Sequence, residues 1–304
     1  MKVLVVGLGV QGRKRSELLG GKFIGSVDPQ SKDATYLDIS DAPIDSFDTV
    51  FLCVPDDQKI KLIEYCILYK KHVLVEKPLT TKDPSELITL QTKANLAGVL
   101  VYTAYNHRFE PHFRAMKEIL DSQELGKIFS VRMFYGNGTS QLVKASPWRD
   151  QGMGVVSDLV PHLLDTLAFW LGVNKLNDLY IRSHNFETIA PDHAVVHANL
   201  SGVAVKLEMS LCMWRNSFFC DIIGDKGSAH ISSLCKWGPS VLTVRKRVLP
   251  SGKPSEELKE LEMPDPTWEL EHEYFFSQIQ NGARTNFATD VWIAEMLREM
   301  EVQL

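Results

Sequence analysis

The sequence lacks several features that would assign it to a membrane or to a nucleic-acid partner. No apolar run reaches the roughly 18 residues that a membrane-spanning helix needs. The first residues form a strand-like segment and not a signal peptide. Basic residues are not in excess, since 33 Lys and Arg face 38 Asp and Glu and the net charge is −5. We therefore expect a cytoplasmic protein whose function involves no membrane and no nucleic acid.

Cysteine is also scarce and shows no pattern. The five cysteines form no Cys-x-x-Cys pair and sit mostly in apolar segments, so we expect buried thiols and neither a disulfide framework nor a zinc site. His193 and His197 share one face of a strand-like run, but the sequence shows no third ligand for them. No metal site is expected.

The chain is long enough for two domains, and its first hundred residues alternate between strand-like and helical segments. With 44% apolar and 23% charged residues, its 304 residues have the composition of an ordinary globular protein. Buried strands are predicted at residues 2–6, 23–27, 49–54, 73–75 and 99–103, and helices at residues 58–70 and 85–96. This alternation predicts an α/β fold in which residues 1–104 form a Rossmann domain with a doubly wound parallel sheet. Between Asp28 and Thr49 the chain is short and polar, so the second crossover helix should be truncated.

A glycine pattern follows the first predicted strand. Residues 7–12, GLGVQG, have the Gly-x-Gly-x-x-Gly spacing of a dinucleotide site. Gly7 permits a tight turn, Gly9 lets the backbone approach a pyrophosphate, and Gly12 lets the next helix pack closely. The diphosphate would lie at the N-terminus of that helix, where unpaired N–H groups favour anions. The basic triplet at residues 13–15 is expected to be solvated or close to phosphate.

Asp28 ends the second predicted strand, where the fold places a carboxylate on the adenosine ribose. A turn-forming role before Pro29 is the alternative. A carboxylate at this position repels a 2′-phosphate, so NAD is favoured over NADP. Three polar neighbours, Ser26, Gln30 and Lys32, nevertheless leave room for NADP.

Glu76, Lys77 and Pro78 directly follow the fourth predicted strand. A lysine at the carboxyl end of a parallel strand lies at the ligand-binding edge of the sheet, where its ammonium can stabilise a developing alkoxide. A surface lysine without such a role is the alternative. The predicted cofactor-binding residues are Gly7, Gly9, Val10, Gln11, Gly12, Asp28, Pro55, Glu76 and Lys77.

After about residue 128 the pattern changes to the period-two alternation of half-buried strands joined by turns. Strands are predicted at residues 128–134, 194–200, 203–211, 217–223, 228–232 and 241–248. Consecutive hairpins of this kind predict an α+β domain over residues 105–304, with a mainly antiparallel sheet and few helices after Leu171.

An apolar helix is predicted at residues 154–171, and three polar residues interrupt it. Asp158, His162 and Asp165 follow one another at i, i+4 and i+7, which places them on one stripe. Because apolar residues occupy most of the circumference, the stripe should face a polar cleft and not open solvent. The alternative is a histidine and an aspartate that satisfy each other in the core. Pro161 lies inside the helix and should bend it.

Together these segments resemble the Gfo/Idh/MocA family of glucose–fructose oxidoreductases and inositol dehydrogenases over essentially the whole chain. The resemblance rests first on the glycine turn and on the Glu-Lys-Pro segment at residues 76–78. Residues 106–111, NHRFEP, are similar to the family's N-x-R-F-x-P, and Asp158 with His162 is similar to its D-x-x-x-H. Residues 148 and 149, Trp148 and Arg149, resemble the family's Trp-Arg pair.

The resemblance implies a nicotinamide-dependent oxidation or reduction of a sugar, polyol or nucleotide sugar. Lys77 would hydrogen-bond the reacting oxygen, His162 would exchange its proton, and Asp158 would orient His162 or the substrate. An imidazole, with an unperturbed pKa of about 6.5, is a suitable base for a hydroxyl proton. The implied substrate-binding residues are Lys77, Asn106, Arg108, Trp148, Arg149, Asp158 and His162. Met153 and Val160 stand where the family usually has glycine. Because both border the implied substrate cleft, the resemblance does not identify which of the family's substrates this chain uses.

Two other functions remain open. A reductase acting on a C=C or imine bond of a non-sugar substrate would need the aspartate–histidine pair less. A non-catalytic, dinucleotide-binding regulator would be expected to have lost the lysine or the histidine, and the chain keeps both. The resemblance also implies a homodimer or homotetramer that pairs through the sheet of the second domain.

Overall fold

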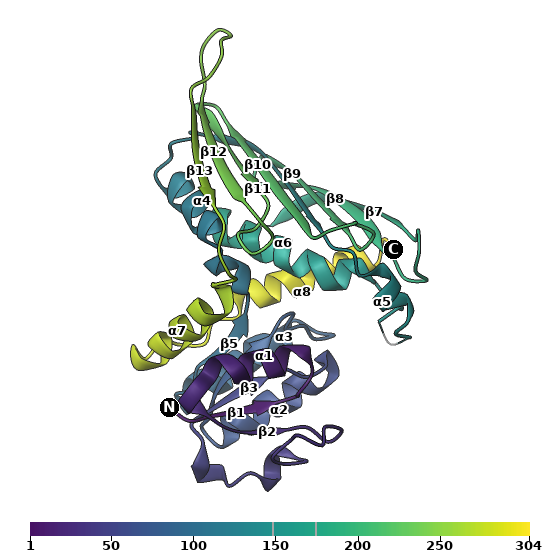
Figure 1. The fold of residues 1–304 in the computed structure, drawn as a ribbon, viewed down its shortest axis with the longest axis vertical. Coiled ribbons are helices and arrows are strands. Elements are labelled where there is room, and N and C mark those ends of the chain that lie inside the picture. Colours follow the sequence, from purple (N-terminus) through teal and green to yellow (C-terminus); the bar gives the residue numbers. More distant parts are fainter. Residues whose placement is uncertain (148, 174) are drawn as a thin grey trace. The chain divides into compact units, whose positions relative to one another are not determined.

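The computed structural model describes residues 1–147, 149–173 and 175–304, and their contacts divide the chain into two compact units (Figure 1). The first unit contains Met1–Asn106 and Thr267–Ala294, and the second contains His107–Pro266 and Glu295–Leu304. The boundary expected after residue 104 is close to the first of these divisions. Residues 267–294, however, belong to the first unit, because a late helix of the chain packs on the first sheet.

The first unit is built on a five-stranded sheet in the order β2-β1-β3-β4-β5, and every neighbouring pair is parallel. The strands are β1 (Val3–Val6), β2 (Phe23–Val27), β3 (Thr49–Leu52), β4 (His72–Glu76) and β5 (Val101–Ala104). All residues of β1 and β3 are buried, as in a parallel sheet that is covered on both faces. The predicted α/β class with a parallel Rossmann sheet is confirmed.

The helices that follow the early strands are α1 (Val10–Leu19), α2 (Asp56–Leu68) and α3 (Ser85–Ala97). The connection from β2 to β3 contains only two short 3₁₀ turns, Ile39–Asp41 and Ile44–Ser46, so the predicted truncation of the crossover helix is confirmed. One apolar cluster joins the sheet to α2 and α3 through Ile63 and Leu90.

A helix from the end of the chain packs on a second apolar cluster of this sheet. It is α7 (Thr267–Gln280), and its Phe275 is fully buried with Val3, Phe51 and Leu74. The Phe275 ring lies edge-on to the Phe51 ring, with centroids 5.7 Å apart.

The expectation of few helices late in the chain is wrong, because both α7 and α8 (Ala288–Glu301) are helices of 14 residues. The buried residues of α7 include Glu271 and His272. These polar residues interrupt the apolar periodicity from which a helix is predicted, so the pattern hid the helix.

The second unit is built on an eight-stranded sheet in the order β13-β12-β11-β10-β6-β9-β8-β7. The strands are β6 (Ile128–Gly136), β7 (Leu176–His184), β8 (His193–Leu200), β9 (Val203–Ser210), β10 (Ser217–Gly224), β11 (Gly227–Ser232), β12 (Ser240–Lys246) and β13 (Glu256–Leu261). Only β6 and β9 pair in parallel, so the predicted mainly antiparallel sheet is confirmed. Strand β13 was not predicted because it is acidic and almost wholly exposed, without the alternation of a half-buried strand. Strand β7 was not predicted either, and its register is irregular between Asn177 and Tyr180.

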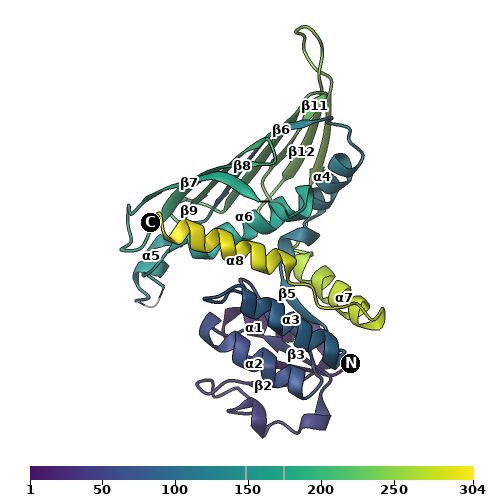
Figure 2. The same ribbon diagram turned by 180° about the vertical axis from the view of Figure 1, so that it is seen from behind.

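Three helices accompany this sheet: α4 (Pro111–Asp121), α5 (Ser140–Lys144) and α6 (Val155–Leu171). Helix α6 begins after Gly154 and ends before Gly172, as predicted, and Pro161 lies inside it. Figure 2 shows α4 and α6 lying along one face of the sheet. Among the described residues, no helix combines the length and the apolar character needed to cross a membrane.

Candidate active site

The glycine turn between β1 and α1 has two glycines that the fold requires and one that it does not. Gly7 has a positive φ of 91°, and a Cβ there would lie 2.3 Å from the carbonyl oxygen of Cys53. A Cβ on Gly12 would lie 1.8 Å from the carbonyl oxygen of Gly7. A Cβ on Gly9 would meet no heavy atom within 4 Å. The open backbone at Gly9 fits the close approach of a dinucleotide diphosphate.

Asp28 follows β2 and holds the same turn in place. Its Oδ2 accepts a 2.8 Å hydrogen bond from the backbone N–H of Leu8, and its Oδ1 accepts from those of Gln30 and Ser31. Partial burial alone would raise the pKa of the Asp28 carboxyl, but these backbone hydrogen bonds outweigh it and lower the pKa below its ordinary value. The carboxylate therefore stays ionised, and the turn-forming role weighed for Asp28 is present in the structure.

Other residues predicted for the cofactor lie at the same edge of the first sheet. Val10 and Gln11 begin α1 and are exposed, and Pro55 directly precedes α2. Strands β2 and β3 lie on opposite sides of β1, so the strand order reverses there. Open α/β sheets bind ligands outside the carboxyl ends of their strands at such a switch point. The first unit thus brings the residues predicted for the dinucleotide to one edge.

Lys77 lies at the carboxyl end of β4, beside Glu76. The Glu76 carboxylate, predicted to bind cofactor, accepts a 2.6 Å hydrogen bond from Nε of Arg15. Arg15 is fully buried, so the expectation of a solvated or phosphate-proximal basic triplet is wrong for this residue. A buried guanidinium keeps its charge only beside carboxylates, and Glu76 supplies one.

Asn106 was predicted to bind substrate and belongs to the first unit. Its side-chain amide donates a 2.8 Å hydrogen bond to Oγ1 of Thr267, and both residues are buried. This bond joins the segment after β5 to the first residue of α7. A role of Asn106 toward a substrate stays a prediction.

His162 and Asp158 lie one turn apart on α6 in the second unit. The His162 ring stacks on the His107 ring, with centroids 4.3 Å apart and an interplanar angle of 22°. The Tyr135 ring of β6 lies edge-on to His162 at 5.7 Å. His107 is part of the NHRFEP segment, so two of the predicted motifs meet here. Aromatic neighbours on two sides restrict the orientation of the imidazole, which a proton-exchanging group needs.

Asp158 is partly exposed. Its side chain is 42% exposed, and its Oδ2 lies 4.0 Å from Nη2 of Arg149, which was predicted to bind substrate. Burial raises the pKa of the Tyr135 phenol, and the negative charge of Asp158 raises it further, so Tyr135 stays protonated. Trp148, the other member of the predicted Trp-Arg pair, lies outside the described residues.

Asp165, the third residue of the predicted stripe, lies in the core. It is fully buried, and its carboxylate accepts charged hydrogen bonds from Nε and Nη2 of Arg108, with Nε 2.9 Å from Oδ2. Burial raises the pKa of the Asp165 carboxyl, and Arg108 offsets this only in part. The expectation that the whole stripe faces a cleft is therefore wrong for Asp165, because Arg108 supplies it with a buried partner. The Arg108 side chain is 28% exposed, and a role toward a substrate stays a prediction.

Within residues 1–147, 149–173 and 175–304, no group of three or more His, Cys, Asp or Glu side chains could hold a metal ion. His193 and His197 lie on β8, as the strand-like pattern predicted. All five cysteines are free, and Cys66, Cys220 and Cys235 are buried.

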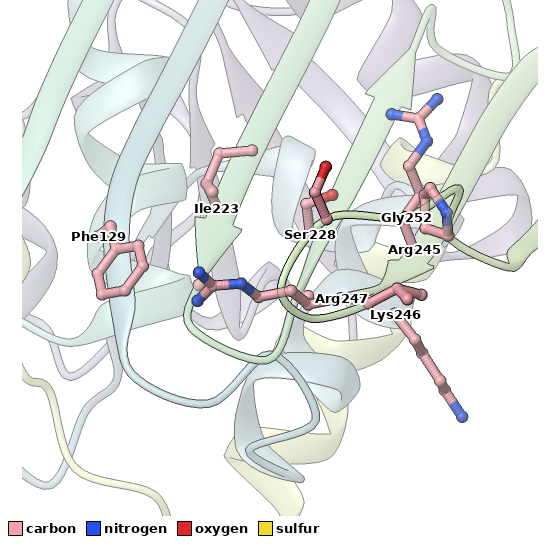
Figure 3. Close-up of a pocket in the computed structure, with 12 residues that line it drawn as sticks. Phe129, Ile223, Ser228, Arg245, Lys246, Arg247 and Gly252 are labelled. Atoms are coloured by element: carbon pink, nitrogen blue, oxygen red, sulfur yellow. The ribbon is translucent and has the colours of Figure 1, made fainter.

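A pocket of about 440 Å³ lies in the second unit, lined by residues of β10, β11 and β12 and of the loop after β12. In Figure 3 the Arg247 side chain lies across it toward Ile223, whereas Arg245 and Lys246 point in opposite directions. Arg245 is paired with Glu256 at 2.8 Å. The three cationic side chains do not converge, and the lining residues include no histidine or carboxylate, so the pocket offers no acid–base pair like Asp158 and His162.

Four residues beside the predicted site residues were missed from sequence: Arg15, Lys59, His107 and Tyr135. Arg15 shares the buried face of α1 with Gly12 at helical spacing, a signal that could have revealed it. His107 lies inside the NHRFEP segment itself. Lys59 has an i, i+3 carboxylate partner in Asp56, but its burial and its bond to the Pro78 carbonyl have no local signal, and neither does the position of Tyr135.

Comparisons with known proteins match both halves of the chain. Residues 1–105 match the oxidoreductase family described as having an NAD-binding Rossmann fold, and residues 113–230 match the GFO/IDH/MocA C-terminal domain. The chain is 24% identical over 254 residues to an inositol 2-dehydrogenase of Rhodococcus erythropolis, covering 76% of this chain and 71% of that protein. It is 24% identical over 255 residues to the trans-1,2-dihydrobenzene-1,2-diol dehydrogenase of Mus musculus, covering 79% and 69%.

The fold is shared with solved structures at low sequence identity. A levoglucosan dehydrogenase in complex with NADH aligns with a TM-score of 0.84 and 16% identity, covering 100% of this chain and 97% of that chain. The first match contains the glycine turn and Lys77, and the second contains Asp158 and His162. The chain therefore belongs to the Gfo/Idh/MocA family of NAD-binding oxidoreductases.

Proposed function

We propose that the protein is an NAD-dependent dehydrogenase that interconverts a hydroxyl and a keto group on a sugar, polyol or nucleotide sugar. Similarity to the inositol and dihydrodiol dehydrogenases and to the levoglucosan dehydrogenase fold supports this substrate class. The observation that carries it lies on α6. There, Asp158 is partly exposed one turn from His162, and His107 stacks on the His162 ring.

The first unit is proposed to hold the cofactor, and a bound NAD would supply the acceptor for a hydride. The glycine turn and the first turn of α1 take the diphosphate. Asp28 already accepts three backbone N–H groups, which leaves about one acceptor position of the carboxylate for a ribose hydroxyl. Its negative charge repels a 2′-phosphate, so NAD is preferred over NADP.

The chemistry at the substrate is proposed to need three side chains. Oxidation of a carbinol carbon requires loss of the hydroxyl proton. Lys77 donates a hydrogen bond to that oxygen and stabilises its alkoxide character. His162 takes the proton on a ring nitrogen and returns it in the reverse direction. Asp158 orients His162 or a substrate hydroxyl.

Recognition of the remaining hydroxyls is assigned mainly to the second unit. Arg149 lies 4.0 Å from Asp158, which supports a shared role in binding. Trp148 keeps its predicted role beside Arg149. Asn106 and Arg108 are engaged with Thr267 and Asp165, so they shape the segment between the two units more than they reach a ligand.

Two alternatives stay weaker than this proposal. A C=C or imine reductase would have little use for the Asp158 and His162 pair. A regulator without activity would have no need to keep Lys77. The three residues together favour hydroxyl chemistry.

Substitution of the proposed acid–base residues tests this function. With NAD and a panel of inositols, levoglucosan and nucleotide sugars, Lys77→Met and His162→Asn should each lower kcat by roughly two to four orders of magnitude. The Kd for NADH, measured by fluorescence, should stay nearly unchanged, because neither substitution removes the diphosphate site.

His197→Ala provides the matched control, because this histidine is exposed on β8 and should leave kcat at the wild-type value. Full turnover by His162→Asn on the true substrate would exclude the mechanism.

We also propose that two or four copies associate through the face of the eight-stranded sheet opposite α4 and α6. On this face Arg132 is exposed, and Phe219, Asp221 and His230 are only partly buried. Phe134 stacks on Phe219 with centroids 4.9 Å apart, and His230 Nδ1 lies 2.7 Å from Asp221 Oδ1. Mixed surfaces of this kind suit association with a second copy. A cytoplasmic location is proposed as well, and the five free thiols are consistent with a reducing compartment.

A further inference from the structure

Both peptide neighbours of Lys77 are held by buried cations. On one side, Glu76 accepts a 2.6 Å hydrogen bond from Nε of Arg15 on α1. On the other side, the carbonyl oxygen of Pro78 accepts a 2.7 Å hydrogen bond from Nζ of Lys59 on α2. The backbone that carries Lys77 is therefore fixed from two different helices.

Each cation is almost completely removed from water. Arg15 is 0% exposed and Lys59 is 2% exposed. Asp56 balances the Lys59 charge at 2.6 Å. Burial lowers the pKa of the Lys59 ammonium, and Asp56 opposes that effect. Apolar side chains of similar size would often stabilise a fold equally well. Buried ion pairs at this place therefore contribute more to fixing the backbone around Lys77 than to the free energy of unfolding.

Three residues of α7 also contact the Arg15 guanidinium. Its Nη2 donates to Oε2 of Glu271, and its Nη1 lies 2.9 Å from Nε2 of His272. The Trp268 ring lies 4.5 Å from the guanidinium carbon. Burial alone would lower the pKa of Arg15, but Glu76 and Glu271 raise it, so the guanidinium stays charged.

The surroundings of His272 decide which residue donates the hydrogen bond between His272 and Arg15. Burial, and then the positive charges of Arg15 and Lys22, lower the pKa of His272 to about 3. The ring is therefore neutral at physiological pH, and its Nε2 accepts the hydrogen bond from Arg15. With Nε, Nη1 and Nη2 each in a different hydrogen bond and one face on Trp268, the guanidinium has a single position.

We propose that Arg15 and Lys59 are positioning residues for Lys77, and that α7 sets the position of Arg15. This inference rests on the proposed function, in which Lys77 contacts the reacting oxygen. Neither cation needs to touch the substrate. A misplacement of about 1 Å at a reacting group can lower a rate roughly a hundredfold, so fixing the two peptide neighbours of Lys77 has a direct catalytic value.

Two conservative variants test the inference without emptying the buried site. Glu76→Gln keeps the shape and an acceptor but removes the charge that Arg15 meets. Lys59→Met keeps an unbranched side chain one atom shorter but leaves the Pro78 carbonyl without the Lys59 donor. Replacing Arg15 itself would remove the buried cation that Glu76 and Glu271 share and would threaten folding.

We expect each variant to lower kcat by roughly 10- to 100-fold. The KM for substrate should change by less than about twofold in both variants, and the Kd for NADH should do so in Lys59→Met, because positioning of the lysine acts in the chemical step. Lys93→Met is the control. It breaks an exposed 2.7 Å pair with Glu64 on the same unit and should leave kcat and KM unchanged.

A second measurement needs no substrate. In the NADH complex with ¹³C-methylated lysines, the Lys77 signal, assigned by its loss in Lys77→Arg, should shift or broaden in Glu76→Gln and Lys59→Met and stay unchanged in Lys93→Met. An unchanged Lys77 signal together with wild-type kcat per folded molecule in both variants would overturn the inference, whatever happens to thermal stability. If the wild type turns over none of the sugars or polyols, the proposed function fails, and the NMR comparison still decides whether Arg15 and Lys59 position Lys77.

Discussion

At the scale of single residues, the β1–α1 turn uses the same amino acid for two purposes. Gly12 lies inside α1, where alanine would ordinarily favour a helix by about 1 kcal/mol. A Cβ at this position meets the Gly7 carbonyl oxygen at 1.8 Å, so the helix can pack only without a side chain. Gly9 meets nothing within 4 Å, so packing does not explain its glycine. The diphosphate proposed to approach the backbone here would account for it.

Alanine at these two positions should therefore have opposite effects. Gly9→Ala should fold with the thermal stability of the wild type and lose roughly tenfold or more in NADH affinity, because its Cβ enters the space proposed for the diphosphate. Gly12→Ala should unfold at a lower temperature or fail to fold. Circular-dichroism melts and NADH fluorescence titrations measure both. Full NADH affinity in Gly9→Ala would contradict the proposed position of the diphosphate.

At the scale of elements, α7 docks on the first sheet with charged as well as apolar side chains. Phe275 fills the apolar cluster, while Glu271 and His272 meet the buried Arg15. Helix α7 is therefore more than a cover. It completes the contacts of Arg15 on α1, and Arg15 in turn bonds Glu76 at the end of β4.

The neutral His272 predicts how the docking of α7 depends on pH. The folded pKa is about 3, whereas an unfolded histidine titrates at about 6.5. As the pH falls below 6.5, the unfolded chain takes up a proton that the folded chain does not, so stability is lost progressively until about pH 3. Between pH 7 and pH 4 this contribution to the free energy of unfolding should fall by about 3 kcal/mol.

His272→Gln isolates this effect, because glutamine does not titrate and can still accept a hydrogen bond from Arg15. Urea unfolding at both pH values should show a loss smaller by about 3 kcal/mol in the variant than in the wild type. Equal losses in the two proteins would show that His272 is not held neutral by its burial.

At the scale of the whole molecule, the chain passes between its two units after Asn106, after Pro266 and after Ala294. The first unit is consequently incomplete without residues from near the C-terminus. The second unit carries the large sheet, with α4 and α6 on one face and half-buried polar and aromatic residues on the other. That second face makes self-association the expected state.

Sedimentation velocity at micromolar concentration should show a dimer or a tetramer. Arg132 is exposed on β6, near the Phe219 ring, and Arg132→Glu should weaken association by placing a negative charge beside Asp221. Lys61→Glu, on the exposed side of α2 in the first unit, is the charge-matched control and should not change the assembly. A wild-type monomer would exclude the proposed interface.

Much of the fold and part of the candidate site could be predicted because their signals are local. The glycine spacing, the buried strand before Lys77 and the apolar run between Gly154 and Gly172 are patterns within a few residues of one another. Asp158 and His162 share a face simply because they are one helical turn apart. Such patterns identify an element and its type without any knowledge of its neighbours.

What the sequence by itself determined is the class of the two domains, the dinucleotide turn and the presence of a lysine, an aspartate and a histidine suited to hydroxyl chemistry. Only the tertiary structure decided that Arg15 is buried, that Asp165 pairs with Arg108, and that α7 returns to the first sheet. The physical reason is the same in each case. A charged side chain is buried only where a hydrogen-bonding or oppositely charged partner is in place. The partners of Arg15 on α7 and of Asp165 lie between 57 and 257 positions away along the chain.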